Sequence, residues 1–256
     1  MKAIILAAGM GTRLGKYTEN LPKGMLEFNG KALIEWQVLK LREAGVTDIS
    51  IITGYMGDRI RISDVTYFHN ENFATTNMVE SLMCAREILN DDVLVAYGDV
   101  IYTSKLAQLA VHYDGDIGVA ADRSWRNYWI ARYGTTEADL ESLAIENGKI
   151  VELGLPREES SGIDFRYIGL IKFSAMGMRK ALEIYDKKKD KNEHWVQSGN
   201  EFKQGYMTDL LNEIIIEGEA VSPIVTDGGW MEFDTVEDYE VMLRELENDA
   251  IAQGFF

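Results

Sequence analysis

Cysteine and proline are both scarce in this chain of 256 residues. Its one cysteine, Cys84, cannot form a disulfide within the chain, so the sequence suits a reducing compartment and we expect a cytoplasmic protein. With three prolines and no segment rich in serine and glycine, the chain shows no linker, and we expect one domain over residues 1–256. No segment approaches the roughly 18 apolar residues of a membrane span, and the apolar run at residues 3–8 is too short for a signal peptide. We therefore expect no membrane association.

Basic residues are also few. Lysine and arginine number 26 against 42 aspartates and glutamates, which gives a net charge of −16. A duplex-binding surface needs clustered basic residues, so we expect no nucleic-acid partner, and the run KKKDK at residues 187–191 predicts a charged surface turn. The composition does not exclude a small anionic substrate, because a local basic pocket can form in an acidic protein. The acidic surface keeps the chains soluble and does not exclude a homodimer.

Short apolar runs alternate with longer amphipathic segments, which is the pattern of βαβ units on a parallel sheet. This predicts an α/β fold with a mixed, mostly parallel sheet flanked by helices. The expected strands lie at residues 2–8, 48–53, 93–97, 116–121, 166–173 and 220–225, and the expected helices at 33–44, 77–89, 104–113, 175–185, 207–217 and 235–247. From about residue 122 to 165 the alternation breaks, and Asn147-Gly148 predicts a hairpin turn. We expect an inserted region here that contains this hairpin and several aromatic residues.

A glycine-rich loop follows the first predicted strand, at residues 7–14 (AAGMGTRL). It matches neither the P-loop nor the dinucleotide-binding pattern. Two glycines in such a loop allow backbone N–H groups to approach phosphates, where Arg13 adds a charged fork and Lys23, after Pro22, adds a point charge. The spacing alone is equally consistent with a tight turn beside two solvated basic side chains.

Residues 4–26, IILAAGMGTRLGKYTENLPKGML, resemble the signature of the sugar-phosphate nucleotidyltransferases and their cytidylyltransferase relatives. The resemblance implies a Rossmann-like nucleotidyltransferase domain in which a phosphate or phosphonate oxygen attacks the α-phosphorus of a nucleoside triphosphate and pyrophosphate leaves. It also implies that Arg13 and Lys23 hold the reacting phosphates. The remaining residues that it assigns to the nucleotide from this segment are Leu6, Ala7, Ala8, Gly9, Gly11 and Thr12.

Two aspartates are candidate ligands of Mg²⁺. Asp99 lies just past the end of the predicted strand at residues 93–97, where open α/β sheets place ligands, and Asp234 lies in the segment GWMEFDT. Taken alone, Asp99 is better explained as a turn residue and Asp234 as a helix N-cap. The family resemblance implies that both hold the metal, with Glu232 as a weaker candidate that faces the substrate.

Other segments resemble the cytidylyltransferases that activate small phospho-compounds, most closely those acting on phosphonates and choline phosphate. They are residues 75–82 (TTNMVESL), 122–129 (DRSWRNYW), 151–154 and 167–170 (YIGL). The resemblance places Asn77 and Ser81 near the nucleotide or acceptor, and Tyr167 at the acceptor. Many sugar-1-phosphate members carry a lysine before the proline of a Glu-x-Lys-Pro-like segment. Here Leu155 precedes Pro156, which argues against a hexose phosphate as the substrate.

The acceptor site is predicted less sharply. Trp125 and Trp129 fall on one face if their segment is helical, and with Trp230 they form either an aromatic wall for an ammonium group or part of the core. An acceptor amine would then pair with a nearby carboxylate, as in 2-aminoethylphosphonate. The carboxylates available for it are Asp209, Glu213 and Glu232. The cations available for the acceptor are Arg123, Arg126, Arg132, Arg166 and Lys172, of which we select Arg132 and Lys172.

The sequence therefore predicts a Mg²⁺-dependent cytidylyltransferase that joins CMP from CTP to a small phosphonate or phosphate ester, such as 2-aminoethylphosphonate, phosphocholine or a phospho-amino acid. The alternatives are a sugar-1-phosphate nucleotidyltransferase that uses UTP or dTTP, and a nucleotide-binding domain without catalysis. Substitution of Lys23 by alanine is expected to lower kcat by orders of magnitude without unfolding, because an exposed charge rarely sets stability.

Overall fold

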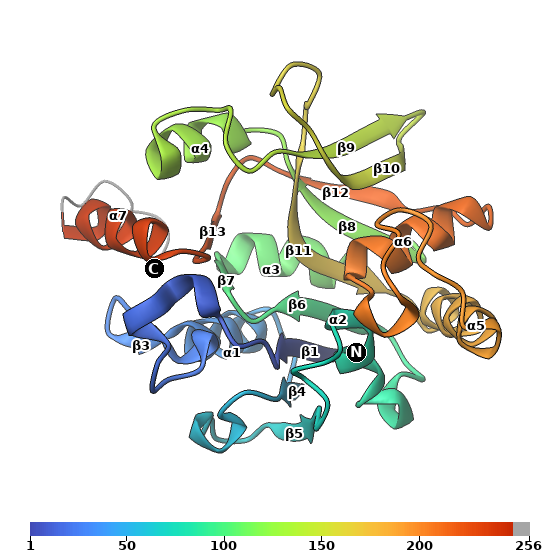
Figure 1. Ribbon diagram of the computed structural model, residues 1–256, viewed down its shortest axis with the longest axis horizontal. Coiled ribbons are helices and arrows are strands. Elements are labelled where there is room, and N and C mark those ends of the chain that lie inside the picture. Colours follow the sequence, from blue (N-terminus) through green and yellow to red (C-terminus); the bar gives the residue numbers. More distant parts are fainter. Residues whose placement is uncertain (248–256) are drawn as a thin grey trace.

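A seven-stranded sheet lies at the centre of the computed structural model, which describes residues 1–247 (Figure 1). In spatial order its strands are β12 (Ser222–Thr226), β8 (Ile117–Asp122), β11 (Arg166–Phe173), β6 (Val93–Tyr97), β1 (Lys2–Ala7), β4 (Asp48–Thr53) and β5 (Thr66–His69). Every neighbouring pair is parallel except those that β11 makes with β6 and β8. The predicted mixed, mostly parallel sheet is confirmed. The last nine residues of the domain predicted over 1–256 lie outside the described part.

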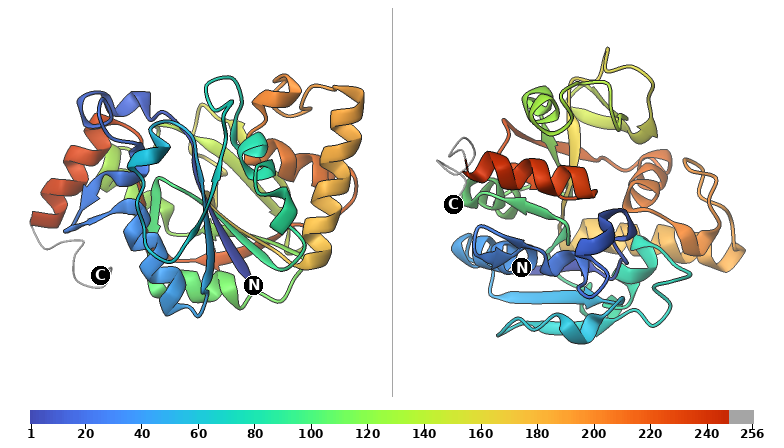
Figure 2. Two further views of the ribbon diagram at one scale, coloured as in Figure 1. Left: turned by 90° about the horizontal axis from the view of Figure 1, so that it is seen from below. Right: turned by 60° about the vertical axis from the view of Figure 1, so that its left-hand side comes forward.

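Helices cover both faces of the sheet (Figure 2). On one face lie α1 (Leu33–Glu43) and α3 (Ser104–Val111), and on the other lie α2 (Met78–Met83), α5 (Ala175–Lys191) and α6 (Met207–Ile216). The central strand β1 is buried from its second residue onward, because its run of alanine, isoleucine and leucine contacts helices on both sides. This two-sided burial gives a rigid floor for the loops at the carboxyl ends of the parallel strands.

The segment predicted as an insertion forms α4 (Trp125–Tyr133) and a hairpin of β9 (Glu141–Glu146) and β10 (Lys149–Pro156). The hairpin turn is Asn147-Gly148, as predicted, and both residues have positive φ, at 50° and 76°. In Figure 1 this segment stands at the top of the molecule, above the sheet. It thereby supplies a wall on one side of the space over the strand ends.

The helix expected at residues 235–247 and several small elements that were not predicted complete the fold. Two short strands, β7 (Val100–Tyr102) and β13 (Trp230–Glu232), pair antiparallel, and α7 (Val236–Glu247) packs against α4 and the 3₁₀ segment η1 (Thr12–Tyr17). The pair β2 (Glu27–Phe28) and β3 (Lys31–Ala32) precedes α1, and single 3₁₀ turns lie at η2 (Lys23–Met25), η3 (Gly57–Arg59), η4 (Arg86–Ile88) and η5 (Phe202–Gln204). No helix among residues 1–247 is long and apolar enough to cross a membrane.

Two helical predictions are wrong in part. The helix expected over residues 77–89 is α2 followed by the separate turn η4. The run KKKDK is the last turn of α5 rather than a surface turn, and Lys188 within it is buried, where it donates to the carbonyl of His194. Lysines at a helix C-terminus interact favourably with the helix dipole, and Asn192, whose φ of 49° is left-handed, caps the helix after Lys191.

Candidate active site

The glycine-rich loop leaves β1 at the carboxyl edge of the sheet. Its Gly11 has a φ of 61°, which glycine adopts without strain, and Thr18 Oγ1 donates to the Gly11 carbonyl at 2.9 Å. In the described residues no acceptor is hydrogen-bonded to the backbone N–H groups of residues 9–13. An ideal Cβ at Gly9 would meet no atom within 4 Å, so the loop faces open space there. These free N–H groups suit an anion.

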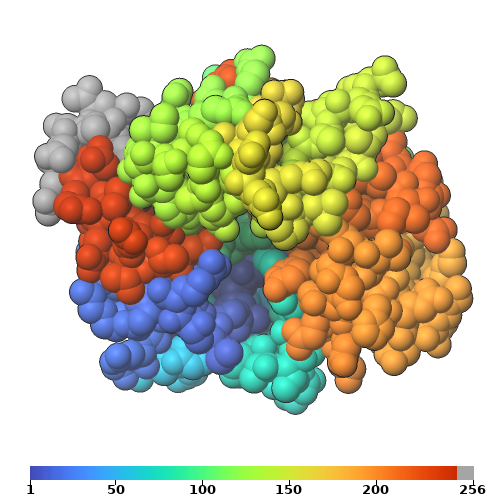
Figure 3. Space-filling view, turned by 45° about the horizontal axis from the view of Figure 1, so that its top comes forward, coloured from blue at the N-terminus to red at the C-terminus, as the bar shows by residue number. Residues whose placement is uncertain are grey.

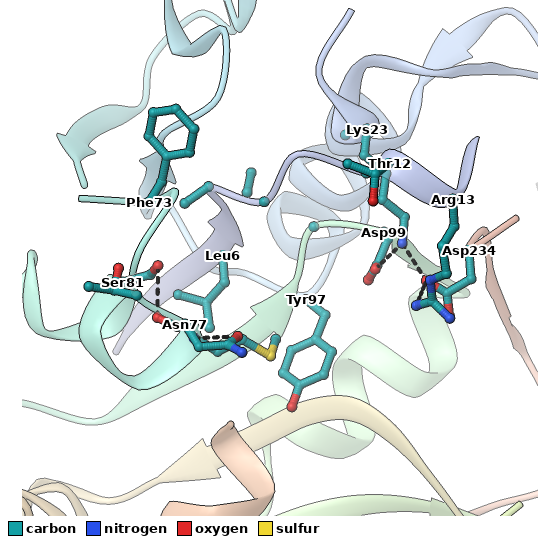
Figure 4. A pocket seen from close by; sticks show the side chains of 18 residues that line it. Leu6, Thr12, Arg13, Lys23, Phe73, Asn77, Ser81, Tyr97, Asp99 and Asp234 are labelled. Carbon is teal, nitrogen blue, oxygen red and sulfur yellow. Dashed lines mark hydrogen bonds and ion pairs between the residues drawn. The ribbon is translucent and has the colours of Figure 1, made fainter. Parts of the chain in front are cut away.

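Lys23 lies between two carboxylates at one end of this space (Figure 4). Its Nζ is 2.5 Å from Oδ2 of Asp99 and 2.5 Å from Oδ1 of Asp234, and Arg13 Nη2 is 3.0 Å from the same Asp234 oxygen. Burial acts to lower the pKa of Lys23, but attraction by the two carboxylates outweighs it and raises this pKa. The four residues predicted to be catalytic are therefore brought together as one charged cluster.

The pairing of β7 with β13 joins the two aspartates, which are far apart in the sequence. Val100 pairs with Glu232, and the Phe233 N–H donates to the Asp99 carbonyl at 3.2 Å. One oxygen from each of Asp99, Glu232 and Asp234 lies within 4.8 Å of the others. Oδ1 of Asp99 is buried without a hydrogen-bond partner. A compact set of carboxylate oxygens with one unsatisfied member fits a hard divalent cation such as Mg²⁺.

The carboxylates of this cluster differ in protonation. Burial would raise the pKa of Asp234, but Lys23, Arg13 and Arg132 together lower it to about 2. Burial, reinforced by the charge of Asp234, raises the pKa of Glu232 to about 7. Asp234 is therefore a permanent anion, whereas the protonation of Glu232 depends on the charges beside it.

Arg132 does not reach the open space, contrary to its predicted role in binding the acceptor. Its side chain is fully buried, and it donates to Glu232 at 2.8 Å and to Asp238 at 2.7 Å. Asp238 in turn accepts the N–H groups of Asp234 and Thr235. Arg132 thus fixes the segment that carries Glu232 and Asp234 from behind.

Two cavities meet at the charged cluster. The first, of about 310 Å³, lies over the glycine-rich loop and α2. All the predicted nucleotide-binding residues line it: Leu6, Ala7, Ala8, Gly9, Gly11, Thr12, Asn77 and Ser81. Asn77 also caps α2, since its side chain accepts the Met78 N–H at 2.9 Å. Figure 4 shows the charged cluster on one side of this cavity and Asn77 and Ser81 on the other.

The second cavity, of about 590 Å³, opens between the β9–β10 hairpin, β11, residues 197–200 and the start of α6. Figure 3 shows the hollow among these segments. Of the predicted acceptor residues, Tyr167, Glu232 and Asp209 line it, and Leu155 lies in its wall. Asp209 is 1% exposed, and its two oxygens already accept the N–H groups of Ser198 and Tyr206, so its main contacts are within the protein.

The remaining predicted acceptor residues lie elsewhere. Trp129 and Trp230 are buried, at 0% and 3% exposure, and their indole N–H groups donate to the Ala138 carbonyl and to Asp122. The aromatic wall is therefore part of the core. Lys172 is wrong as an acceptor ligand, because it pairs with Leu94 near the opposite end of β6 and is bound to Asp92. Burial of these side chains leaves acceptor recognition to other groups.

Several residues of the second cavity were not selected from the sequence. Tyr97 lines both cavities, and its ring meets that of Tyr167 edge-on with the two hydroxyls 2.8 Å apart. Arg166 and Glu141 face the second cavity from β11 and β9. Arg166 was among the available cations, but nothing in its local sequence separates it from the other four. Of these five cations, Arg166 alone is in the wall of either cavity.

Comparison with known proteins decides the family. Residues 3–152 match the family model of the MobA-like NTP transferase domain. The chain belongs to this family. As a family member it is a nucleotidyltransferase, which confirms the predicted enzyme class and the resemblance stated for residues 4–26.

Its relatives include cytidylyltransferases that align with nearly the whole chain. The CTP:phosphoglutamine cytidylyltransferase of Campylobacter jejuni is 30% identical over 96% of this chain and 100% of its own. A solved structure of CTP:phosphocholine cytidylyltransferase from Streptococcus pneumoniae has 25% identity and a TM-score of 0.70 over 96% of this chain and 98% of that chain. A UTP–glucose-1-phosphate uridylyltransferase of Haloferax volcanii is 24% identical over 98% of each chain. The relatives of this chain thus include both cytidylyltransferases and a uridylyltransferase.

Proposed function

We propose that the chain transfers CMP from CTP to a small phosphate or phosphonate ester and releases pyrophosphate, with Mg²⁺ as cofactor. The observation that carries this is the position of the charged cluster. Arg13, Asp99 and Asp234 line both cavities, so the cluster lies where a nucleotide in the first cavity would meet an acceptor in the second. Attack on the α-phosphorus needs that juxtaposition and needs neutralisation of phosphate charge.

Each part of the site has a proposed task. The free backbone N–H groups of residues 9–13 would hold the triphosphate, and Arg13 would add a charged hydrogen bond to it. Asp99 and Asp234 would hold Mg²⁺, with Glu232 beside them. A bound Mg²⁺ would neutralise phosphate oxygens and orient the leaving pyrophosphate. Lys23 would then exchange its carboxylate partners for the oxygens of the reacting phosphates.

The choice of cytidylyl transfer to a small ester is supported by two of the named relatives, which act on phosphoglutamine and phosphocholine. Leu155 in the wall of the second cavity supports it as well, since a sugar-phosphate enzyme would be expected to present a lysine there. We further propose that the segment 122–165 forms the acceptor wall of a single domain and that the enzyme acts in the cytoplasm.

Pyrophosphate release tests the proposal. CTP, UTP, dTTP and ATP are each supplied with Mg²⁺ and with 2-aminoethylphosphonate, phosphocholine, a phospho-amino acid or glucose 1-phosphate. Turnover with CTP and a small ester, abolished by EDTA, is the expected result. Turnover only with UTP or dTTP and glucose 1-phosphate would replace the proposal with the sugar-nucleotide alternative. Tight CTP binding without any turnover would leave a non-catalytic nucleotide-binding protein.

A further inference from the structure

Arg166 has unused hydrogen-bond donors in the wall of the second cavity. Its side chain is 6% exposed, and its Nη1 is buried without a hydrogen-bond partner. Its Nη2 reaches Asp139 only at 3.4 Å, and that aspartate is 46% exposed. A buried donor left unsatisfied costs about 1–3 kcal/mol, so this guanidinium is poorly paired by the protein itself.

The orientation of Arg166 is nevertheless fixed. Its Cζ lies 4.5 Å from the ring centroid of Trp129, which is fully buried and held by its own hydrogen bond to the Ala138 carbonyl. A guanidinium stacked on an indole keeps its planar fork in one direction. A planar, bidentate partner such as a carboxylate matches that fork, and it would displace the long contact with Asp139.

Glu141 is a complementary group in the same wall. It lines the second cavity from β9, and no donor in the described residues is hydrogen-bonded to its carboxylate. Burial raises the pKa of Glu141, and the nearby Arg166 acts to lower it. The wall thus presents an underused fork of donors beside an underused acceptor, which is the complement of a ligand that carries both charges.

We propose that Arg166 and Glu141 bind the end of the acceptor remote from its phosphorus, and that this end carries a carboxylate and an ammonium group, as in a phosphorylated amino acid. This rests on the proposed function, because it identifies the acceptor of that same reaction. The cavity extends from Arg13 and the carboxylates Asp99 and Asp234 to these two residues, so one acceptor spans both ends. A quaternary ammonium ion has no N–H for Glu141 and no acceptor for Arg166.

A matched set of acceptors tests the inference in the wild-type enzyme. Phosphoserine carries both groups, phosphoethanolamine lacks the carboxylate, and 3-phosphoglycerate has a hydroxyl in place of the ammonium group. Phosphoglutamine and phosphocholine complete the set. With CTP and Mg²⁺, kcat/KM for phosphoserine or phosphoglutamine is expected to exceed that for each of the other three acceptors. The expected ratio is roughly 10- to 100-fold, because each of those three lacks at least one charge-assisted hydrogen bond to Arg166 or Glu141.

Two variants assign the preference to residues. Arg166→Lys, which keeps the charge and loses the fork, is expected to bring the ratio of phosphoserine to phosphoethanolamine close to one. Glu141→Gln is expected to do the same for the ratio of phosphoserine to 3-phosphoglycerate. Arg123→Lys is the control, because this exposed side chain is paired with Asp227 outside both cavities, and it is expected to leave both ratios unchanged.

The outcomes separate the two proposals. Equal or better turnover of phosphocholine or phosphoethanolamine with CTP overturns the inference and leaves the proposed function intact. Unchanged ratios in both variants also overturn it. Absence of turnover with every nucleotide and acceptor overturns the proposed function and the inference with it. If Arg166→Lys fails to fold, the wild-type preference and the ratio in Glu141→Gln still decide.

Discussion

Replacing Lys23 with methionine removes the cation that two carboxylates share. The Nζ contacts Asp99 and Asp234 at 2.5 Å each, and the Lys23 side chain is only 15% exposed. The expectation that Lys23 is an exposed charge without influence on stability is therefore wrong. Removing one partner of a buried ion pair costs about 3–5 kcal/mol, and the partial exposure of this cluster favours the lower end, about 3 kcal/mol. For a chain of this size that lowers Tm by about 6–12 °C.

Mg²⁺ distinguishes this explanation from a general packing defect. A divalent cation bound by the carboxylates supplies the missing positive charge, so Mg²⁺ is expected to raise the Tm of Lys23→Met more than that of the wild type. The kcat of Lys23→Met is nevertheless expected to fall by about 10²–10³-fold, because a positioned charge at the reacting phosphates is lost. Thermal unfolding over a Mg²⁺ titration and steady-state pyrophosphate release measure the two effects.

Lys16→Met is the matched control for this prediction. Lys16 is 63% exposed and forms a single surface pair with Glu240, a kind of interaction worth about 0–1 kcal/mol. We expect it to change neither kcat nor the response of Tm to Mg²⁺. The reasoning fails if Lys23→Met matches the wild type in kcat, or if Mg²⁺ raises the Tm of Lys23→Met and the Tm of the wild type equally.

Three further predictions follow from single contacts. Arg132→Met leaves the buried Asp238 and the half-buried Glu232 without their partner and should lower the free energy of unfolding by about 3–5 kcal/mol in urea, whereas Arg132→Lys should recover part of the loss. In metal-free buffer the free energy of unfolding should fall as pH rises from about 4.5 to 7, because folded Glu232 retains a proton that the unfolded chain has released. If the free energy of unfolding of Glu232→Gln falls with pH as steeply as that of the wild type, this explanation is contradicted. Gly98→Ala places a Cβ 2.7 Å from the Leu6 carbonyl oxygen and should cost about 1–3 kcal/mol, while Gly9→Ala, with no atom within 4 Å, should cost much less by the same unfolding measurement.

The part of the candidate site around the glycine-rich loop could be predicted because it is local. The loop at residues 7–14 follows β1 directly, so the strand places its backbone at the sheet edge whatever the rest of the chain does. Asp99 could be placed for the same reason, since it follows β6. Periodicity and turn residues also gave the sheet strands except β5, whose exposed pattern carries little hydrophobic signal.

The lining of the second cavity could not be predicted because it depends on contacts between distant segments. Trp125 and Trp129 do share a face of α4, but only the position of α4 decides that this face covers the core. Lys172 lies on β11 six residues after Arg166, and the antiparallel direction of that strand puts the arginine at the site and the lysine at the opposite end. Spacing along a sequence does not reveal strand direction.

The charge of the cluster explains how so acidic a chain can accept a triphosphate. Lys23, Arg13 and Arg132 face four carboxylates, Asp99, Glu232, Asp234 and Asp238, so three positive charges offset most of the negative charge at this place in a chain that carries −16 as a whole. A triphosphate would add several negative charges to this set, and Coulomb repulsion by the carboxylates would oppose it. A divalent cation held by Asp99 and Asp234 would offset this repulsion, and Lys23 would then be available to the phosphates. Nucleotide binding is therefore expected to require the metal, and equal CTP affinity with Mg²⁺ and with EDTA in isothermal titration would contradict this account.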